Sequence, residues 1–296
     1  MKYLLLLVLC VTESVMASTA VKILWPFGPV AATVPIRAMM DQVNTIQKDQ
    51  VFTIEFATGG GGTVAVTAAA QSKQPVILAH SNAFFINPLV SGDNPYNIND
   101  WRMLHHICDT SFMIASVKYK TMKELPADKT ISIGHLGVNS TTHFVMQLLA
   151  KSHSNMQAVP YKASSQAVPD LLGGHVDMVV SLPGDLMKHY AAGQLSVLGA
   201  TGRAAIGQIP LLSKSGYTDA ANIQSSYYLF VNKNTDPILV KNWLSWFSQS
   251  VTLAAEQAMA NVYCRPGNIM SQPQLDNEFA RVSTYWQSVV NSVTKK

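Results

Sequence analysis

Short apolar segments alternate with segments of helical periodicity along most of the chain. The run Val-Lys-Ile-Leu-Trp at 21–25 predicts a strand, closed by Pro26. Residues 33–46 have apolar positions three and four apart, and they predict a helix with Pro35 in its first turn. A second apolar strand pattern follows at 51–56. This order favours parallel strands joined by crossover helices.

The same alternation continues to the C-terminus. Further strands are expected at 76–79, 131–133, 177–181 and 195–201, and further helices at 63–71, after residue 140, and before Gly173-Gly174 and Gly193. Two strong helices begin at Asp236-Pro237 and at Pro273. Their inward positions are predicted to be Ile238, Val240, Leu244, Phe247 and Val251, and Leu275, Phe279, Val282, Trp286 and Val289. The pattern as a whole predicts α/β layers with largely parallel sheets.

The chain shows no fixed-period repeat, low-complexity tract or Pro/Ser-rich linker. Two domains would therefore be joined by strands or short connections, and the β-rich stretches 112–117 and 227–231 are the candidates. If both cross between lobes, the first lobe is discontinuous. We expect lobe 1 to comprise 18–114 plus 231–296, and lobe 2 to comprise 115–230.

The first 17 residues have the pattern of a cleavable signal peptide. Lys2 gives a positive start, residues 4–9 form a short apolar core, and Val15-Met16-Ala17 is a small-residue cleavage site. The alternative is a hydrophobic first strand. The core is too short to span a bilayer, and no later apolar run approaches the roughly 20 residues that a span needs. We expect an exported, soluble protein.

Charge and cysteine content narrow the possible partners. The net charge of +4 comes from scattered basic residues, without the clusters typical of nucleic-acid binding or a polybasic membrane anchor. We therefore expect no nucleic-acid partner.

Apart from Cys10, the chain has two cysteines, Cys108 and Cys264. An oxidising compartment permits a disulfide between them, and two free buried thiols are the alternative.

The most informative segment is 134–147, where a predicted strand leads through small and hydroxyl residues into a helix. A helix N-terminus presents free backbone N–H groups and a positive dipole end, and this makes the loop a candidate anion site. It contains no Lys or Arg, so a carboxylate would be held by dipoles and hydroxyls. An ordinary capped helix is the alternative. Ser81 and Ser181 end predicted strands, where cleft residues lie in open α/β sheets.

Three rival sites have weaker support. Adjacent His105 and His106 on a strand point to opposite faces, and no second ligand cluster accompanies them, so we expect no metal site. The glycines at 59–62 lack the Lys-Ser/Thr ending of a phosphate-binding loop. Ser140 and His143 are one helical turn apart and could form part of a cleft hydrolase, but the chain has no G-x-S-x-G elbow.

Several motifs, in this order and spacing, resemble the periplasmic solute receptors of tripartite tricarboxylate transporters, also called the Bug family. The resemblance covers nearly the whole mature chain. The motifs are Trp25-Pro26-Phe27-Gly28-Pro29-Val30-Ala31-Ala32-Thr33, the four glycines at 59–62, residues 81–88, Ser140-Thr141-Thr142-His143, residues 159–164, residues 170–178, Ala192-Gly193-Gln194-Leu195 and Gly202-Arg203.

The resemblance implies a two-lobed, periplasmic-binding-protein-like fold of type II, with a small carboxylate in the interlobe cleft. It also implies that two strand–loop–helix elements, mapping onto Phe27–Thr33 and Gly137–His143, hold the carboxylate from opposite lobes. Lys162 is the candidate cation for a second carboxylate. The ligand-binding residues we predict are Phe27, Ala31, Ala32, Thr33, Ser81, Asn82, Gly137, Ser140, Thr141, Thr142, His143, Tyr161, Lys162 and Ser181.

The first loop departs from the family pattern. Val30-Ala31 stands where the family usually has Gly-Gly, and Val34 stands where an acidic residue is common. Side chains at 30 and 31 would narrow the cleft and restrict the backbone. Loss of the acid would remove a partner for a ligand amino or hydroxyl group. The identity of the ligand therefore stays open.

The resemblance predicts a non-enzymatic, monomeric receptor without a cofactor that delivers a small organic anion to membrane permease subunits. Two alternatives stay open. The first is a ligand-dependent periplasmic sensor for a membrane kinase. The second is a cleft hydrolase that uses Ser140 and His143.

Overall fold

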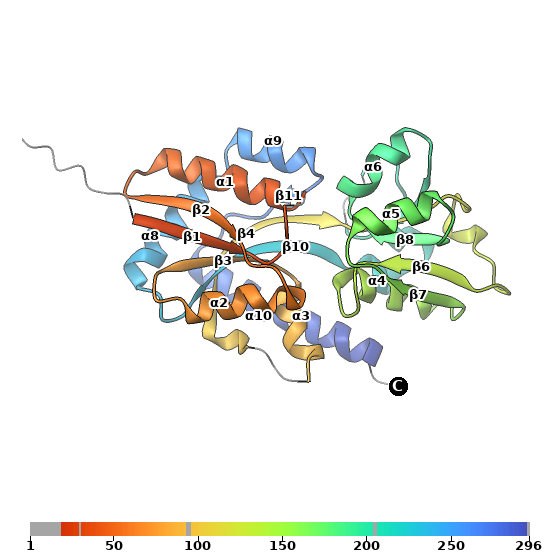
Figure 1. The fold of residues 1–296 in the computed structure, drawn as a ribbon, viewed down its shortest axis with the longest axis horizontal. Coiled ribbons are helices and arrows are strands. Elements are labelled where there is room, and N and C mark those ends of the chain that lie inside the picture. Colours follow the sequence, from red (N-terminus) through yellow and green to blue (C-terminus); the bar gives the residue numbers. More distant parts are fainter. Residues whose placement is uncertain (1–18, 30, 93–95, 204–205, 295–296) are drawn as a thin grey trace, which may run out of the picture.

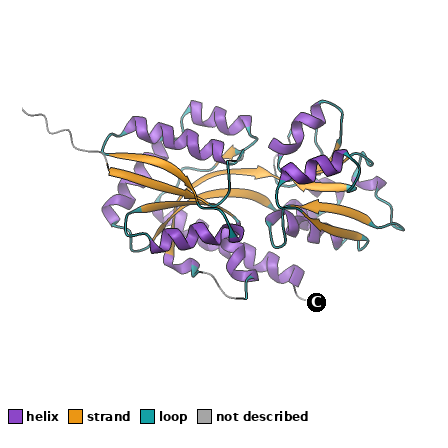
Figure 2. Ribbon diagram, viewed as in Figure 1, coloured by secondary structure: helices purple, strands orange, loops and turns teal. Residues whose placement is uncertain are grey.

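The computed structural model describes residues 19–29, 31–92, 96–203 and 206–294. Two lobes lie side by side, each built on its own sheet with helices packed against it (Figure 1, Figure 2). The predicted α/β, two-lobed class is confirmed. Residues 1–17, predicted as a signal peptide, fall outside the described residues.

The first lobe contains a six-stranded sheet in the order β11-β4-β10-β3-β1-β2. Strands β1, β2 and β3 are parallel to one another, whereas β10 is antiparallel to β3 and β4, and β11 is antiparallel to β4. The bounds are β1 Thr19–Trp25, β2 Gln50–Phe56, β3 Val76–Ser81, β4 Trp101–Ser111, β10 Gln224–Asn232 and β11 Arg265–Pro266. The helices are α1 Thr33–Ile46, α2 Thr63–Gln71, α3 Ala83–Val90, α8 Pro237–Gln249, α9 Leu253–Asn261 and α10 Gln272–Thr294.

The second lobe contains a five-stranded sheet in the order β7-β6-β8-β5-β9. Strands β6, β7 and β8 are parallel, and β5 is antiparallel to both β8 and β9. The bounds are β5 Met113–Ser116, β6 Ile131–His135, β7 Met156–Pro160, β8 Met178–Ser181 and β9 Ser196–Ala200. The helices are α4 Thr141–Ala150, α5 Ser164–Leu172, α6 Pro183–Ala191 and α7 Thr218–Ala221.

The alternating side chains of β1 supply apolar residues to both faces of the first sheet. Ile23 and Trp25 are fully buried in a cluster with residues of α1 and α8, whereas Leu24 belongs to a cluster with residues of α2 and α3. Successive strand residues point to opposite faces, so a strand covered on both sides reads as a continuous apolar run. This explains the unbroken apolar run at 23–25.

The chain passes between the lobes at Phe112, which links β4 to β5, and again between Ala200 and Gln224. Strand β10 belongs wholly to the six-stranded sheet, so the predicted lobe boundary between residues 230 and 231 falls inside it. The boundary between 114 and 115 falls inside β5 of the second sheet. An apolar pattern marks a strand but does not say which sheet the strand joins.

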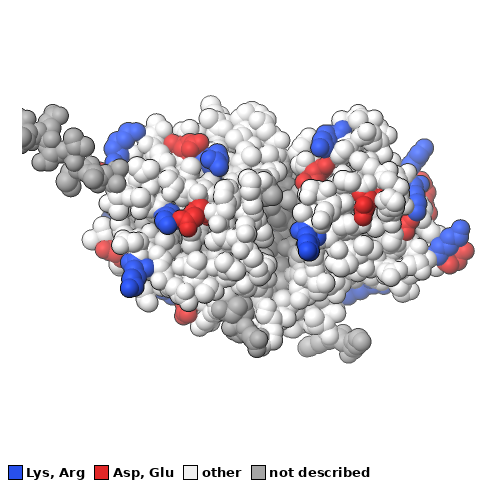
Figure 3. All heavy atoms as spheres, in the orientation of Figure 1, with Lys and Arg blue, Asp and Glu red and all other residues white. Residues whose placement is uncertain are grey.

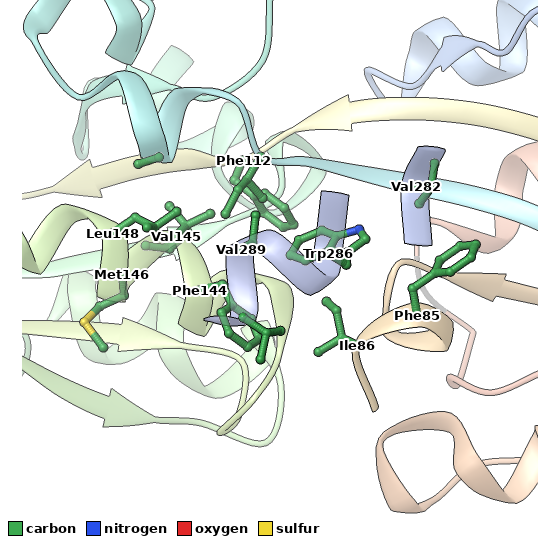
Figure 4. Close-up of a cluster of buried hydrophobic side chains, with 14 of the residues drawn as sticks. Phe85, Ile86, Phe112, Phe144, Val145, Met146, Leu148, Val282, Trp286 and Val289 are labelled. Atoms are coloured by element: carbon green, nitrogen blue, oxygen red, sulfur yellow. The ribbon is translucent and has the colours of Figure 1, made fainter. Parts of the chain in front are cut away.

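Helix α10 connects the two lobes through a shared apolar cluster. Figure 4 shows Val282, Trp286 and Val289 of α10 between Phe85 of α3 and Phe144 of α4. The rings of Trp286 and Phe144 are 6.1 Å apart, centroid to centroid. The cluster therefore spans both lobes, although their sheets are separate.

A disulfide joins Cys108 of β4 to Cys264, the residue before β11. It fixes β11 and the end of α9 to the first sheet, and this is one of the two alternatives that the sequence left open.

At the start of α8, Ile238 is 69% exposed, so its predicted inward position is wrong. The buried face of α8 is formed by Val240, Trp243 and Phe247 instead. None of the described helices is long and apolar enough to cross a membrane.

Candidate functional site

The parallel strands of both sheets end at the boundary between the lobes. Tyr227, near the start of β10, pairs with Ser81 at the end of β3. Met113, directly after the first crossing, pairs with Ser181 at the end of β8. Both serines therefore lie where the chain passes from one lobe to the other. In open α/β sheets, ligands bind at the carboxyl ends of parallel strands.

The two lobes enclose a hollow between them on the face shown in Figure 3, and most atoms beside it belong to uncharged residues. A small cavity of about 10 Å³, the scale of one water molecule, lies between the lobes. A Cβ built on Gly184 of α6 would lie 3.2 Å from the Cβ of Ala31, so the lobes are in contact there. The cavity is lined by Ala31, Ala32, Pro35, Thr110, Leu182, Gly184, Tyr227, Val262 and Cys264.

In the second lobe, the turn between β6 and α4 is held in shape by residues in the left-handed region. Gly137 has φ 93° and Asn139 has φ 63°. Ser140 has extended backbone angles and caps α4, because its Oγ accepts a hydrogen bond from the N–H of His143 at 3.2 Å. Serine is among the residues that favour this position. The predicted helix after residue 140 is confirmed.

Most polar groups of this turn are paired within it. The Oγ1 of Thr142 accepts a hydrogen bond from the N–H of Leu136 at 2.8 Å and lies 2.9 Å from the Oγ of Ser140. The N–H of Asn139 donates to Nδ1 of His143 at 3.0 Å. Within the described chain, the N–H groups of Thr141 and Thr142 donate to no other group. These two amides at the start of α4 are donors that the turn can offer to an anion.

Two stacked histidines, His135 and His143, support this turn. The rings of His135 and His143 lie 4.5 Å apart, centroid to centroid. Burial, and then the proximity of His135, lower the pKa of His143 to about 4, and burial also lowers the pKa of His135. Because Nδ1 of neutral His143 accepts from Asn139, its proton is assigned to Nε2. Neither ring nitrogen then has a free lone pair with which to activate Ser140.

In the first lobe, Phe27 packs the turn between β1 and α1 against neighbouring aromatic rings. Its ring lies edge-on to Trp25 at 5.1 Å and to His80 at 5.9 Å. Ala32 and Thr33 are buried at the start of α1, while Ala31 is partly exposed. Val30 is outside the described residues. This turn faces α6 across the lobe boundary through Ala31.

Two predicted contacts of the first lobe are used within the protein. The side-chain amide of Asn82 donates to the carbonyl of Gln224 at 2.5 Å. The Oγ of Ser81 accepts from the N–H of Ala83 at 3.3 Å. Both side chains are buried, and the Asn82 bond fixes the start of α3 to the second crossing segment.

The three remaining predicted residues differ in their surroundings. The hydroxyl of Tyr161 donates to Oδ2 of Asp170 at 2.8 Å, and burial followed by this bond raises the pKa of Tyr161 to about 12. Lys162 is exposed. The hydroxyl of Ser181, fully buried, donates to Oδ2 of Asp185 at 2.6 Å.

Asp185 is a candidate residue that our sequence reasoning did not include. It lies in the first turn of α6, and its Oδ1 accepts a second hydrogen bond from Ser164 at 3.0 Å. Burial, with a smaller contribution from the Asp185 carboxylate, raises the pKa of Tyr227 to about 12. Asp185 is therefore electrostatically close to the first-lobe sheet. An acid one turn after a strand-ending serine, preceded by Pro183-Gly184, was the available signal.

The histidines of β4, His105 and His106, were the weakly supported candidates for a metal site. Among the described residues, no three His, Cys, Asp or Glu side chains are grouped so as to hold a metal ion. His106 instead lies 3.0 Å from Oδ1 of Asp109 and stacks on Tyr228. Burial lowers the pKa of His105 to about 3. These groups serve the core of the first lobe.

Comparison with known proteins gives a consistent result. The model of the tripartite tricarboxylate transporter family receptor matches residues 36–279. A UPF0065 protein encoded in the gbd 5′ region of Cupriavidus necator is 25% identical over 233 residues, 74% of this chain and 70% of that protein.

Solved structures show the same fold at low identity. The periplasmic binding protein BugD has a TM-score of 0.80 at 18% identity, covering 94% of this chain and 98% of that one. A protein of R. palustris, solved with adipate, has a TM-score of 0.80 at 16% identity, covering 93% of this chain and 97% of that one.

Proposed function

The chain belongs to the tripartite tricarboxylate transporter receptor family, and from this we propose that it is a periplasmic receptor for a small organic carboxylate. The observation that carries the proposal is the pair of amide donors at Thr141 and Thr142, which start α4 beside the lobe boundary. A structural neighbour solved with adipate supports a carboxylate as the class of ligand.

The binding energy can come from main-chain dipoles. A hydrogen bond to a charged group contributes about 1.5–3 kcal/mol. Two amides at α4, joined by one or two groups from the turn after β1, would reach roughly micromolar affinity after the cost of ordering the ligand is subtracted. We expect Phe27 to lie against the ligand from the first-lobe side, since its ring packs at the end of β1.

Closure of the lobes follows from the same arrangement. The cavity between them, about 10 Å³, is smaller than an organic anion, so the lobes must part before a ligand enters there. A ligand that bridges both turns binds the closed form better and shifts the population toward it. We propose that membrane permease subunits recognise this closed form.

We propose that the receptor does not turn its ligand over. A hydrolase based on Ser140 needs a base with an available lone pair. The hydrogen bond from Asn139 occupies Nδ1 of His143, and the low pKa of His143 disfavours protonation of the ring. This argues against the Ser140–His143 hydrolase.

A thermal-shift series with mono-, di- and tricarboxylates and amino acids tests the class of ligand. A ligand at 100 times its Kd adds about 2.7 kcal/mol to the free energy of unfolding. We expect at least one carboxylate to raise the melting temperature. Stabilisation by neutral sugars or metal ions alone would rule out the proposed carboxylate receptor.

The substitution Thr141→Pro tests the donor pair. Thr141 is the first residue of α4 and follows an extended Ser140, a position that accepts proline. The change deletes one free N–H with little strain, so we expect the carboxylate affinity to fall about tenfold to hundredfold in isothermal titration.

Two variants control this experiment. Thr141→Ala keeps the N–H and removes the hydroxyl, and we expect it to bind within a few-fold of the wild type. Leu253→Pro places proline at the first position of α9, where Leu253 is 85% exposed, and should leave binding unchanged. Wild-type affinity in a folded Thr141→Pro variant would remove this amide from the site.

A further inference from the structure

We propose that Asp185 determines ligand specificity by accepting a hydrogen bond from a protonated amine, so that the receptor prefers amino-bearing carboxylates to the corresponding simple carboxylates. This inference rests on the proposed carboxylate-receptor function and extends it to the class of substrate. It is carried by the position, the hydrogen bonding and the unpaired charge of Asp185.

Asp185 does not itself line the interlobe cavity, but its sequence neighbour and its hydrogen-bond partner both lie at the boundary between the lobes. Its neighbour Gly184 lines the interlobe cavity and approaches Ala31 of the opposite lobe. Its hydrogen-bond partner Ser181 ends β8, at the edge of the sheet that faces the first lobe. It also lies within electrostatic reach of Tyr227 on β10. These contacts place Asp185 on the side of the second lobe that faces the first lobe.

The carboxylate is oriented before any ligand arrives. Ser181 donates to Oδ2 at 2.6 Å, and Ser164, at the start of α5, donates to Oδ1 at 3.0 Å. An ionised carboxylate offers about four acceptor positions, and two hydroxyl donors leave others open. The dipole of α6 stabilises the negative charge in its first turn. The carboxylate of Asp185 is therefore held in a fixed orientation and can accept further hydrogen bonds.

The charge of Asp185 has no counter-ion within the protein. Among the described residues, no Lys, Arg or His forms an ion pair with it within 4.0 Å. An additional carboxylate of a ligand placed beside it would be repelled, whereas an ammonium group would be attracted. A ligand with one carboxylate at α4 and an amine toward α6 would match both ends of the site.

An independent observation comes from the first-lobe side of the same cavity. Thr110 lines the cavity, is 5% exposed, and its hydroxyl has no hydrogen-bond partner among the described residues. A buried hydroxyl without a partner is destabilising unless a ligand or water pairs with it. A polar group of the ligand beside Asp185 would also satisfy Thr110.

The test compares matched pairs of probes: aspartate with succinate, and glutamate with glutarate, by isothermal titration of the purified protein. We expect the wild type to bind the amino member of at least one pair about tenfold or more tightly than its partner. Asp185→Asn keeps the size and the acceptor oxygen but loses the charge, and should reduce that ratio to within about threefold. Asp185→Ser is a second charge-removing variant in case the first does not fold.

Asp236→Asn is the matched control, since Asp236 caps α8 and its carboxylate accepts from the N–H of Ile238. We expect it to keep the wild-type ratio. A wild type that prefers succinate and glutarate, or an unchanged ratio in folded Asp185 variants, would overturn this inference while leaving the carboxylate receptor intact. Failure of every carboxylate to bind would overturn the proposed function, and this inference with it.

Discussion

Burial, and then the proximity of His135, lower the pKa of His143 and keep it in its neutral form. Its Nδ1 accepts the N–H of Asn139, and its ring stacks on His135. Protonation would break the first interaction and place positive charge beside a second histidine. The residue therefore supports the turn, in which the amides of Thr141 and Thr142 have no hydrogen-bond acceptor among the described residues.

This neutral state predicts a dependence of stability on pH. The pKa of His143 falls from the usual value of 6.5 to about 4 in the folded protein, so between these values the unfolded chain binds a proton that the folded chain does not. The free energy of unfolding should therefore decrease as the pH falls from about 6.5 to about 4. Urea unfolding across this range measures it.

The variant His143→Asn separates this residue from the other buried histidines. An asparagine Oδ1 can take the place of Nδ1 as the acceptor for Asn139, but asparagine does not titrate. We expect a shallower slope of stability against pH between about 4 and 6.5. A slope identical to that of the wild type would mean that His143 is not held neutral.

At the residue scale, the sequence predicted which segments form the site but not how each side chain is used. The segments around Ser81, Ser140 and Ser181 were found because each ends a strand or begins a helix. The hydroxyls of Thr142 and Ser181 are nevertheless occupied by Leu136 and Asp185. Such pairings depend on rotamers and on neighbours from other elements, which a periodic pattern does not encode.

Helix α10 packs against elements of both lobes. Its residue Trp286 is 1% exposed and lies between α3 and α4 (Figure 4). Trp243 of α8 is equally buried but belongs to a cluster of the first lobe alone. Two tryptophans of similar burial therefore differ in whether they connect the lobes.

This difference gives a prediction for the element scale. Trp286→Ala should lower the free energy of unfolding by about 3–5 kcal/mol, because it removes a large buried side chain and leaves a cavity. It should also accelerate hydrogen exchange in α4 of the other lobe. Trp243→Ala should destabilise by a similar amount without this effect on α4. Unchanged exchange in α4 of the Trp286 variant would contradict a shared core.

Most helices and strands were predictable, because hydrophobic periodicity reports burial directly. Helices α1 and α2 begin and end at the predicted residues. Ile238 was placed wrongly because it lies two residues before Val240, about 200° around the helix, and so points away from the buried face of α8. The sheet that β10 joins and the Cys108–Cys264 pairing depend on contacts between distant segments, and the sequence pattern left both unresolved.

At the scale of the whole molecule, the fold brings two turns from separate sheets to one boundary. The registers of β3 with β10 and of β8 with β5 force the parallel strands of both lobes to end there. The shared cluster around α10 keeps the lobes attached while the opposite side can open. We therefore propose that ligand binding and closure are coupled by the architecture rather than by any one residue.

The central claim is that turns from opposing lobes hold a carboxylate through main-chain N–H groups. A crystal structure of the protein grown with aspartate or succinate, whichever binds more tightly, tests it most directly. We predict carboxylate oxygens about 2.7–3.2 Å from the amide nitrogens of Thr141 and Thr142, with Phe27 and residues 31–33 on the opposite side. A ligand bound outside the interlobe boundary, or held by one lobe alone, would contradict the account.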